Sequence, residues 1–228
     1  KMQKIIVFGS SEIAELAKYY FEEEEKAEVV AFTVDDEYIK EDNFLGCPIV
    51  PFSKLSESFP PSEFNMHVAL SYKRLNKLRE EKYFQAKNSG YKLESFISNN
   101  SVISSNASIG DNCFILENQT IQPLVSIGSN VMLWSGNHIG HGTSIGDHSY
   151  LASHVVVSGN CKIGQRCFFG VNSTLKDYLE IGNDCFISMD ASITKDLNNG
   201  SVVLPAKSNY FEADAELAIK IKKNYFGI

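Results

Sequence analysis

The amino-acid sequence predicts a mainly β protein in which a parallel β-helix follows a small Rossmann-like α/β domain. The first observation behind this prediction is a large apolar residue at every sixth position from Ile103 to Ile193. The second is that the residues before this repeat alternate short apolar runs with amphipathic, charged runs. An α-helix spaces its apolar residues by about 3.6 positions and a lone strand by about 2, so a strict period of six requires another structure. A hexapeptide repeat is the signature of a parallel β-helix.

The repeated residues are expected to form the core of a three-sided prism. Each six residues make one short strand and one corner, and three such units close a coil, so residues 18 apart should stack about 4.8 Å from each other. Burial of each large apolar side chain contributes roughly 1.5–3 kcal/mol to stability. The column consists of Ile103, Ile109, Ile115, Ile121, Ile127, Leu133, Ile139, Ile145, Leu151, Val157, Ile163, Phe169, Leu175, Ile181, Ile187 and Ile193.

Composition and cysteine placement narrow the function classes. Cys113, Cys161, Cys167 and Cys185 all stand two positions before a column residue. We therefore expect them inside the prism as small hydrophobes rather than as disulfides or metal ligands. The chain is 43% hydrophobic and 21% charged with a net charge of −7, which is typical of a globular protein and argues against nucleic-acid binding. The sequence has neither an apolar leader nor an apolar run of about 18 residues, so we expect a cytoplasmic protein without a membrane span.

The first part of the chain is expected to form a parallel sheet with flanking helices. Strands alternating with helices are typical of a Rossmann-type unit. The run at 46–50, with its glycine and proline, is expected to be a connector. Apolar runs predict strands at 4–8, 29–34 and 66–70. Amphipathic or charged runs predict helices at 13–22 and 73–88.

Ligands of such a sheet bind at the carboxyl ends of its strands. The residues that the sequence places there are Gly9, Ser10, Ser11, Asp35, Asp36 and Ser71. An NAD site would need three glycines, and Gly9 stands alone. A nucleotide with its phosphates at the start of the first helix and its base or ribose at the acidic pair fits better. The alternative is a capping serine followed by a solvent-facing acidic turn.

The order of these parts resembles one family. A small Rossmann-like domain, hexapeptide repeats and a late Pro-Ala-Lys resemble the bacterial sugar acyltransferases. These include sialic-acid O-acetyltransferases and N-acetyltransferases of UDP-linked 4-amino sugars such as bacillosamine. The resemblance spans residues 2–207 and is most specific over 136–148 and 158–164. It implies a left-handed β-helix, an exception to the right-handed crossover rule. It also implies acetyl-CoA as acyl donor and a homotrimer with acyl-CoA in the groove between neighbours.

The resemblance further implies roles for individual residues. His141 matches the family's catalytic base, and Gly159 matches the glycine whose N–H meets the thioester carbonyl. A Glu often follows the base in relatives, but Gly142 stands there, so another group must orient His141. Glu12 would put a carboxylate near the expected phosphates. The remaining implied residues are Gly9, Ser10 and Ser11 for phosphates, Asp35 and Asp36 for the base, Ser71, Asn137 and His138 for the substrate, and Gly159, Pro205, Ala206 and Lys207 for acyl-CoA.

These residue types suit acyl transfer. Attack of an amine or hydroxyl on a thioester needs a base, which histidine supplies near neutral pH. It also needs a donor aimed at the developing oxyanion, which a glycine amide at a corner can supply. Inward-pointing cysteines favour direct transfer over a covalent intermediate. No metal is expected, because the pair His138 and His141 has no third ligand at suitable spacing.

We therefore expect an acetyl-CoA-dependent N-acetyltransferase that acts on a UDP- or dTDP-linked amino sugar. Its parts would be a nucleotide-sugar-binding α/β domain at 1–97, a β-helix at 98–207, and a C-terminal segment at 208–228 with an amphipathic helix at 212–224. The alternatives are a sialic-acid-type O-acetyltransferase and a non-catalytic trimeric scaffold that binds nucleotide sugars. The sequence does not determine the sugar, the acylated position or the acyl group.

Overall fold

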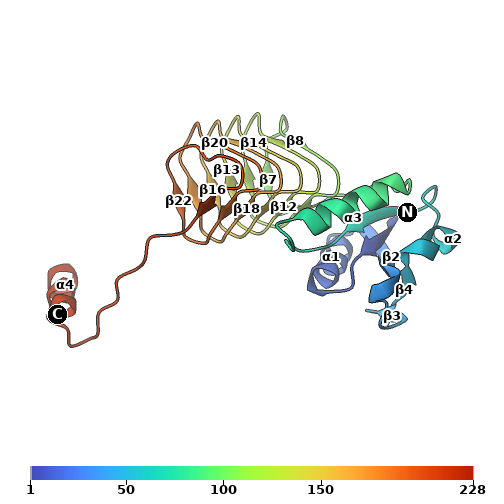
Figure 1. Ribbon diagram of the computed structural model, residues 1–228, viewed down its shortest axis with the longest axis horizontal. Coiled ribbons are helices and arrows are strands. Elements are labelled where there is room, and N and C mark those ends of the chain that lie inside the picture. The colour runs from blue at the N-terminus through green and yellow to red at the C-terminus, as the bar shows by residue number, and fades with distance from the viewer. Residues whose placement is uncertain (1, 228) are drawn as a thin grey trace.

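The computed structural model describes residues 2–227 and has three parts along its long axis (Figure 1). A small α/β domain lies at one end and a β-helix forms the middle. A helix, α4 (Glu216–Phe226), lies at the other end on an extended arm. The predicted fold, a left-handed parallel β-helix after a Rossmann-like domain, is confirmed.

The sheet of the α/β domain is mostly parallel. Its strands are β1 (Gln3–Phe8), β2 (Ala27–Val34), β3 (Asn43–Phe44), β4 (Cys47–Pro51) and β5 (Asn65–Val68). They run in the order β3-β4-β2-β1-β5, and only β3 and β4 are antiparallel. Short helical turns η1 (Asp36–Tyr38) and η2 (Phe52–Lys54) lie in the connections.

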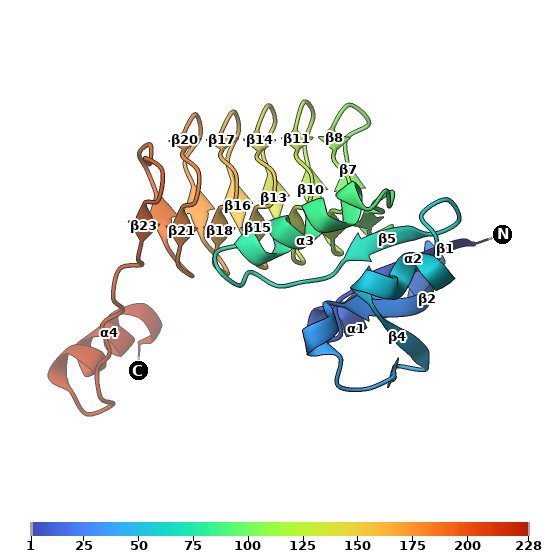
Figure 2. The same ribbon diagram turned by 45° about the vertical axis from the view of Figure 1, so that its right-hand side comes forward.

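Helices cover both faces of this sheet, as alternation along β1 requires. Ile5 and Val7 face α1 (Glu12–Glu23), which lies between the sheet and the β-helix. Ile6 and Phe8 belong to a second core cluster with residues of α2 (Leu55–Ser58) and α3 (Lys77–Asn88). Figure 2 shows α3 running alongside the β-helix.

Three expected boundaries are wrong. Residues 47–50 of the expected connector belong to strand β4, because Ile49 and Val50 pair with Phe32 and Thr33 of β2. Helix α3 begins at Lys77 rather than at residue 73, because Arg74, Leu75 and Asn76 are left-handed. Helix α4 begins four residues later than expected and ends two residues later.

The β-helix consists of three parallel sheets of two-residue strands, which we name by their outward side chains. The aromatic sheet contains β6 (Phe96–Ile97), β9 (Phe114–Ile115), β12 (Met132–Leu133), β15 (Tyr150–Leu151), β18 (Phe168–Phe169), β21 (Phe186–Ile187) and β23 (Val202–Val203). The mixed sheet contains β7 (Val102–Ile103), β10 (Thr120–Ile121), β13 (His138–Ile139), β16 (Val156–Val157), β19 (Thr174–Leu175) and β22 (Ser192–Ile193). The polar sheet contains β8 (Ser108–Ile109), β11 (Ser126–Ile127), β14 (Ser144–Ile145), β17 (Lys162–Ile163) and β20 (Glu180–Ile181).

The six-residue column forms the core of the prism. Residues 18 apart pair in register on each sheet, as Ile121 does with Ile139 and Ile139 with Val157. The column from Ile115 onward is buried, and its first two members are partly buried. The four cysteines of the repeat are fully buried and free, as predicted.

The two domains share a packed junction. Phe21 of α1 contacts Phe96, and Phe96 contacts Phe114 of the aromatic sheet. On the other side of the junction, the buried Arg79 of α3 donates hydrogen bonds to the carbonyl oxygens of Asn130 and His148. The α/β domain is thereby fixed against the first coils of the β-helix.

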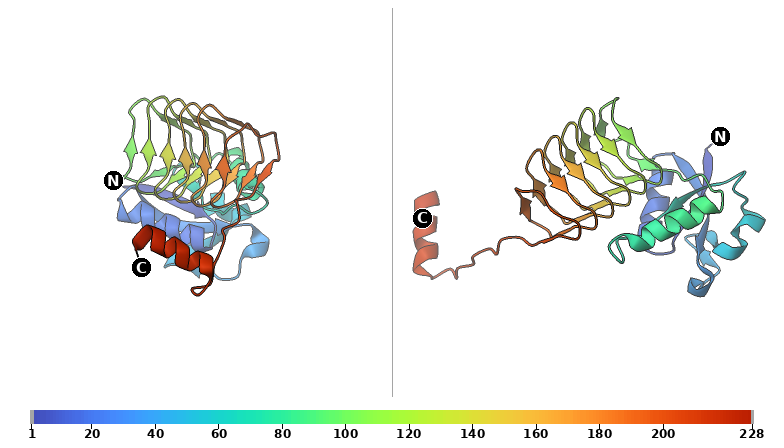
Figure 3. Two further views of the ribbon diagram at one scale, coloured as in Figure 1. Left: turned by 90° about the vertical axis from the view of Figure 1, so that its left-hand side faces the viewer. Right: turned by 45° about the horizontal axis from the view of Figure 1, so that its top comes forward.

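The C-terminal helix stands apart from both domains in Figure 1 and in the right-hand view of Figure 3. Its apolar side chains, such as Leu217 and Ile221, are exposed, and only Ala218 is buried. No helix within residues 2–227 combines the length and the apolar character needed to cross a membrane.

Candidate functional site

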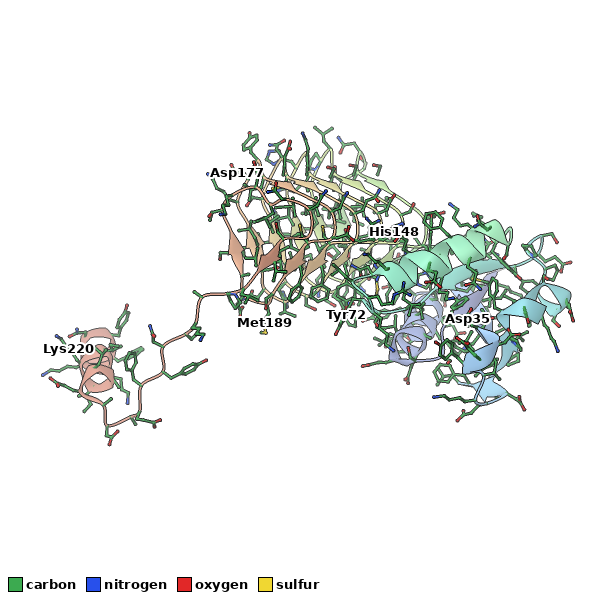
Figure 4. All side chains as sticks on the ribbon, in the orientation of Figure 1. Asp35, Tyr72, His148, Asp177, Met189 and Lys220 are labelled. Carbon is green, nitrogen blue, oxygen red and sulfur yellow. The ribbon has the colours of Figure 1, made fainter. Side chains whose placement is uncertain are left out.

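Most of the predicted site residues lie in or near two places. One is a corner of the β-helix, between β13 of the mixed sheet and β14 of the polar sheet. The other is a cleft in the α/β domain, at the carboxyl ends of β1 and β2. Figure 4 shows Asp35 in the α/β domain, away from the coils of the β-helix.

At the corner, His141 lies directly against Gly159 of the next coil. A Cβ added to Gly159 would lie 2.6 Å from Cε1 of His141 and 3.0 Å from each ring nitrogen. The imidazole ring therefore occupies the space that any side chain at residue 159 would fill. The backbone stacks in register here, since Asn160 N–H donates to the His141 carbonyl oxygen at 2.7 Å.

The amide of Gly159 is available to a ligand. Among residues 2–227 its N–H has no hydrogen-bond acceptor, whereas its carbonyl oxygen accepts the N–H of Tyr178 at 3.0 Å. His141 is exposed. The corner thus brings a solvent-accessible imidazole and an unpaired amide N–H together on adjacent coils.

Amide side chains hold the imidazole. Gln122 Oε1 accepts the backbone N–H of His141 at 2.9 Å and lies 3.4 Å from its Nδ1. Asn160 Nδ2 lies 3.4 Å from its Nε2. A side chain at Gly142, which has φ +66°, would collide with Asn160 Oδ1. The orienting groups therefore come from the preceding and following coils rather than from residue 142.

The side chain of Asn137 does not face the corner that carries His141. Its side chain is buried inside the prism, where Oδ1 accepts the N–H of Val155 and Nδ2 donates to the Trp134 carbonyl oxygen. The sequence prediction failed because asparagine two positions before a column residue points inward, as the cysteines do. His138 lies on the outer face of the mixed sheet, between Thr120 and Val156.

The cleft of the α/β domain has a volume of about 680 Å³. Gly9, Ser10, Ser11 and Asp35 line it, as the sequence suggested. Gly9 has φ +131°, and a Cβ there would lie 2.7 Å from the Ala69 carbonyl oxygen, so this turn requires glycine. The start of α1 opens into the cleft, and the Ser11 hydroxyl makes no capping hydrogen bond.

Asp36 and Ser71 are outside the cleft lining. Asp36 accepts hydrogen bonds from Ser53, and these bonds lower the pKa of its carboxyl group. Ser71 instead presents its carbonyl oxygen to Arg79. The loops after β2 and β5 still reach the cleft through other residues, among them Tyr38, Lys40 and Lys73.

The charge of the cleft is mixed. Asp35 is held by Lys82, whose Nζ lies 2.7 Å from Oδ2. Lys40 and Lys73 also line the cleft, are mostly exposed, and form none of the ion pairs found in residues 2–227. Glu12 is absent from the lining, whereas Glu41 lines the cleft and adds a second carboxylate to that of Asp35.

The Pro205–Lys207 loop lies elsewhere in the chain. It follows β23, the last strand of the aromatic sheet, and begins the arm to α4. His141 and Gly159 lie at the corner between the other two sheets. One copy of the chain therefore does not bring the loop to the histidine corner.

Sequence reasoning missed Gln122, Asn160 and Arg79. Gln122 follows the column residue Ile121, at a position where several other coils have glycine. It stands 18 residues before Gly140, so the repeat itself places it beside His141. Arg79 carried no such signal, since a basic residue on a charged helix is usually exposed.

Comparison with known proteins agrees with this architecture. A family model described as bacterial transferase hexapeptide (six repeats) matches residues 125–159. A second, described as hexapeptide repeat of succinyl-transferase, matches residues 161–195. No curated protein sequence matches the chain.

Solved structures match nearly the whole chain. The acetyltransferase domain of PglB from Neisseria gonorrhoeae FA1090 is 18% identical, with a TM-score of 0.77 over 90% of this chain and 100% of its own. PerB from Caulobacter crescentus is 20% identical, with a TM-score of 0.76 over 89% of this chain and 94% of its own. WeeI from Acinetobacter baumannii AYE is 18% identical, with a TM-score of 0.57 over 89% of this chain and 100% of its own.

The resemblance noted in the sequence is thus confirmed by the repeats and by the arrangement of both domains. The chain contains hexapeptide repeats folded as a left-handed β-helix, and its two-domain fold is similar to that of the PglB acetyltransferase domain and of PerB.

Proposed function

We propose that this protein is an acetyl-CoA-dependent N-acetyltransferase that acts on a nucleotide-linked amino sugar, with a UDP- or dTDP-linked sugar as the expected acceptor. The observation that carries the proposal is the exposed His141 imidazole against the unpaired N–H of Gly159. A base and an oxyanion donor on adjacent coils are the two groups that direct acyl transfer requires.

In the proposed reaction, the amine nitrogen of the sugar attacks the thioester carbonyl carbon of acetyl-CoA. The Gly159 N–H donates to the carbonyl oxygen as negative charge develops on it. His141 Nε2 accepts the proton that the amine loses. The C–S bond then breaks, and the imidazolium returns the proton to the thiolate of CoA. The products are the N-acetyl sugar and CoA thiol.

The cleft of the α/β domain supports the nucleotide part of the proposal. The first turn of α1 has unpaired N–H groups, and its dipole favours an anion there. Lys40 and Lys73 add positive charge that no carboxylate within residues 2–227 neutralises by an ion pair. This arrangement suits a diphosphate better than a neutral sugar.

The structural neighbours support the same substrates. One structure of the PglB acetyltransferase domain contains acetyl coenzyme A. PerB was solved with CoA and GDP-perosamine, and it is a perosamine N-acetyltransferase. Two variants of that enzyme, with a histidine replaced by asparagine or alanine, were solved with the same pair of ligands.

We also propose that the enzyme is a homotrimer in which acyl-CoA lies between neighbouring β-helices. The Pro205–Lys207 loop and the His141 corner lie on different sides of one prism. A second copy would bring its own loop to this corner. Sedimentation or light scattering of the full chain measures the mass.

The test is acetylation by the full-length chain. The purified protein is mixed with acetyl-CoA and a panel of UDP-, dTDP- and GDP-linked 4-amino sugars. Thiol release gives the rate, and mass spectrometry identifies the product. Sialic acid and the matching 4-hydroxy sugars form the hydroxyl arm. Acetylation of the amine arm is expected, and turnover confined to the hydroxyl arm would overturn the N-acetyl assignment.

Substitution of the base completes this test. His141→Ala is expected to lower kcat by roughly 10²–10⁴-fold. The melting temperature should stay within about 2 °C of wild type, because the side chain is exposed. A variant with near wild-type kcat would show that His141 is not the base.

A further inference from the structure

We propose that Gln122 is the positioning residue for His141, and that it fixes the neutral imidazole with its proton on Nδ1 and its lone pair on Nε2. The proposal deepens the function proposed above. It rests on that function because the tautomer matters for catalysis only if His141 is the base. The tautomer itself is a property of the free protein and can be measured without substrate.

The hydrogen-bond pattern determines which atom of Gln122 faces the histidine. The backbone N–H of His141 can only donate, and the side-chain atom 2.9 Å from it must therefore be the amide oxygen. The same oxygen lies 3.4 Å from Nδ1. Since an amide oxygen only accepts, Nδ1 must carry the proton.

The other side of the ring leads to the same tautomer. Asn160 Nδ2, which can only donate, lies 3.4 Å from Nε2. A donor at this position requires the lone pair on Nε2. Two independent contacts, one on the preceding coil and one on the following coil, thus select the same form of the imidazole.

The fold explains why Gln122 reaches the histidine. Gln122 follows Ile121 at a corner and stands one coil before Gly140, which has no side chain to block its path. The next residue along, Pro123, accepts the N–H of Gly142 with its carbonyl oxygen at 3.0 Å. This bond ties the coil that carries Gln122 to the loop that carries His141.

The neutral amide oxygen of Gln122 should affect the His141 imidazole differently from a carboxylate at the same position. A carboxylate beside Nδ1–H stabilises the imidazolium and raises the pKa of the base, whereas an amide oxygen mainly sets orientation. No ion pair within residues 2–227 includes His141, so a carboxylate introduced at residue 122 would give this ring an ion-pair partner that it lacks in wild type. Gln122→Glu therefore separates the orienting effect from the electrostatic one.

The primary experiment is ¹⁵N NMR of the histidine ring in the full-length protein without ligands. His141→Asn identifies the His141 signals by their loss. Wild type should show a protonated Nδ1 and an unprotonated Nε2 above the titration midpoint. Gln122→Met removes the acceptor with little change of length, and the signals should shift toward an Nε2–H form or an average. An unchanged Nδ1–H tautomer in this variant would overturn the proposal.

The second readout is kinetic. Gln122→Met should lower kcat by roughly 10–100-fold, as other orienting partners do, with KM changed less than about twofold. Gln122→Glu should restore kcat and move the acidic limb of the kcat profile upward by about one pH unit. Thr194→Met is the matched control, since Thr194 occupies the same corner position on a later coil.

The outcomes separate this proposal from the proposed function. If wild type acetylates no acceptor but the NMR shifts follow Gln122, the function fails and the positioning role stands. If wild type is active and Gln122→Met matches Thr194→Met in both tautomer and kcat, the positioning role fails alone. Should Gln122→Met not fold, Gln122→Glu retains the acceptor and its shifted profile decides the question.

Discussion

His141 and His148 lie at successive corners of one coil, and their surroundings differ in every respect. His141 is exposed, and within residues 2–227 its ring nitrogens have hydrogen-bond partners only in the side-chain amides of Gln122 and Asn160. His148 is 3% exposed, lies under α3 (Figure 4), and has its Nε2 3.6 Å from Glu80 Oε1. Burial lowers the pKa of His148 below its usual range. The α/β domain therefore buries the corner that carries His148, where the histidine contributes to packing. It leaves the corner that carries His141 exposed, so a ligand can reach it.

Substitution of Arg79, which contacts the buried corner of His148, is expected to have the largest effect on stability. Its guanidinium donates to the carbonyl oxygens of Asn130, His148 and Ser149, and no carboxylate of residues 2–227 forms an ion pair with it. Burial lowers the pKa of Arg79 to about 10, so it remains charged at neutral pH. Arg79→Met leaves the Asn130 and His148 carbonyl oxygens unpaired, whereas Ser149 keeps the N–H of Met132. We expect a loss of about 3–5 kcal/mol in the free energy of unfolding.

Denaturant unfolding of Arg79→Met and His141→Ala gives the contrast. The first variant should be strongly destabilised, and the second should match wild type. Equal stability of the two variants would contradict the view that the His148 corner serves stability and the His141 corner does not.

Acid should destabilise the folded protein through its buried histidines. His67 is 1% exposed, and burial lowers its pKa to about 4, an effect to which the nearby Arg79 charge adds. The hydrogen bond to the Glu94 carbonyl oxygen and the Glu94 charge oppose the shift. Because the unfolded chain binds a proton near pH 6.5 and the folded one does not, stability is complete above pH 6.5 and falls toward pH 4. The expected loss from His67 is about 3 kcal/mol.

His67→Gln keeps a donor toward the Glu94 carbonyl oxygen and removes the titration. Its free energy of unfolding should depend less on pH than that of wild type between pH 6.5 and 4. A pH slope unchanged by the substitution would mean that His67 is protonated in the folded state.

Gly159→Ala is a substitution at the exposed corner of His141. Its φ is not positive, so alanine is tolerated by the backbone, but the new Cβ would lie 2.6 Å from His141 Cε1. The ring must move away from Gln122 and Asn160. We expect kcat to fall about 100-fold, as misplacements of about 1 Å do, with little loss of stability. Ser158→Ala, one residue earlier, is the control and should stay within about twofold of wild type.

The repeat was predictable from sequence because one physical rule governs it. A side chain two positions before a column residue points inward, and residues 18 apart stack, so the cysteines and the pairing of His141 with Gly159 follow. The α/β domain lacks such a rule. Whether Asp36 enters the cleft depends on Ser53, and the left-handed turn at Asn76 depends on the Cys167 carbonyl oxygen. Contacts between segments far apart in the chain decide these positions, and local patterns do not record them.

Two lysines that line the cleft, Lys73 and Lys82, differ in the same way as the two histidines. Lys82 is paired with Asp35 at 2.7 Å, whereas Lys73 lines the cleft without an ion pair in residues 2–227. Lys73→Ala should raise the KM for the nucleotide sugar about tenfold with kcat unchanged, because a phosphate contact binds substrate and transition state equally. Lys162→Ala removes an exposed lysine of the polar sheet and is the matched control. Initial rates at several ionic strengths sharpen the result, since added salt should weaken substrate binding in wild type more than in Lys73→Ala. Equal changes of KM in both variants would reduce Lys73 to general surface charge and leave the start of α1 as the remaining phosphate-binding element.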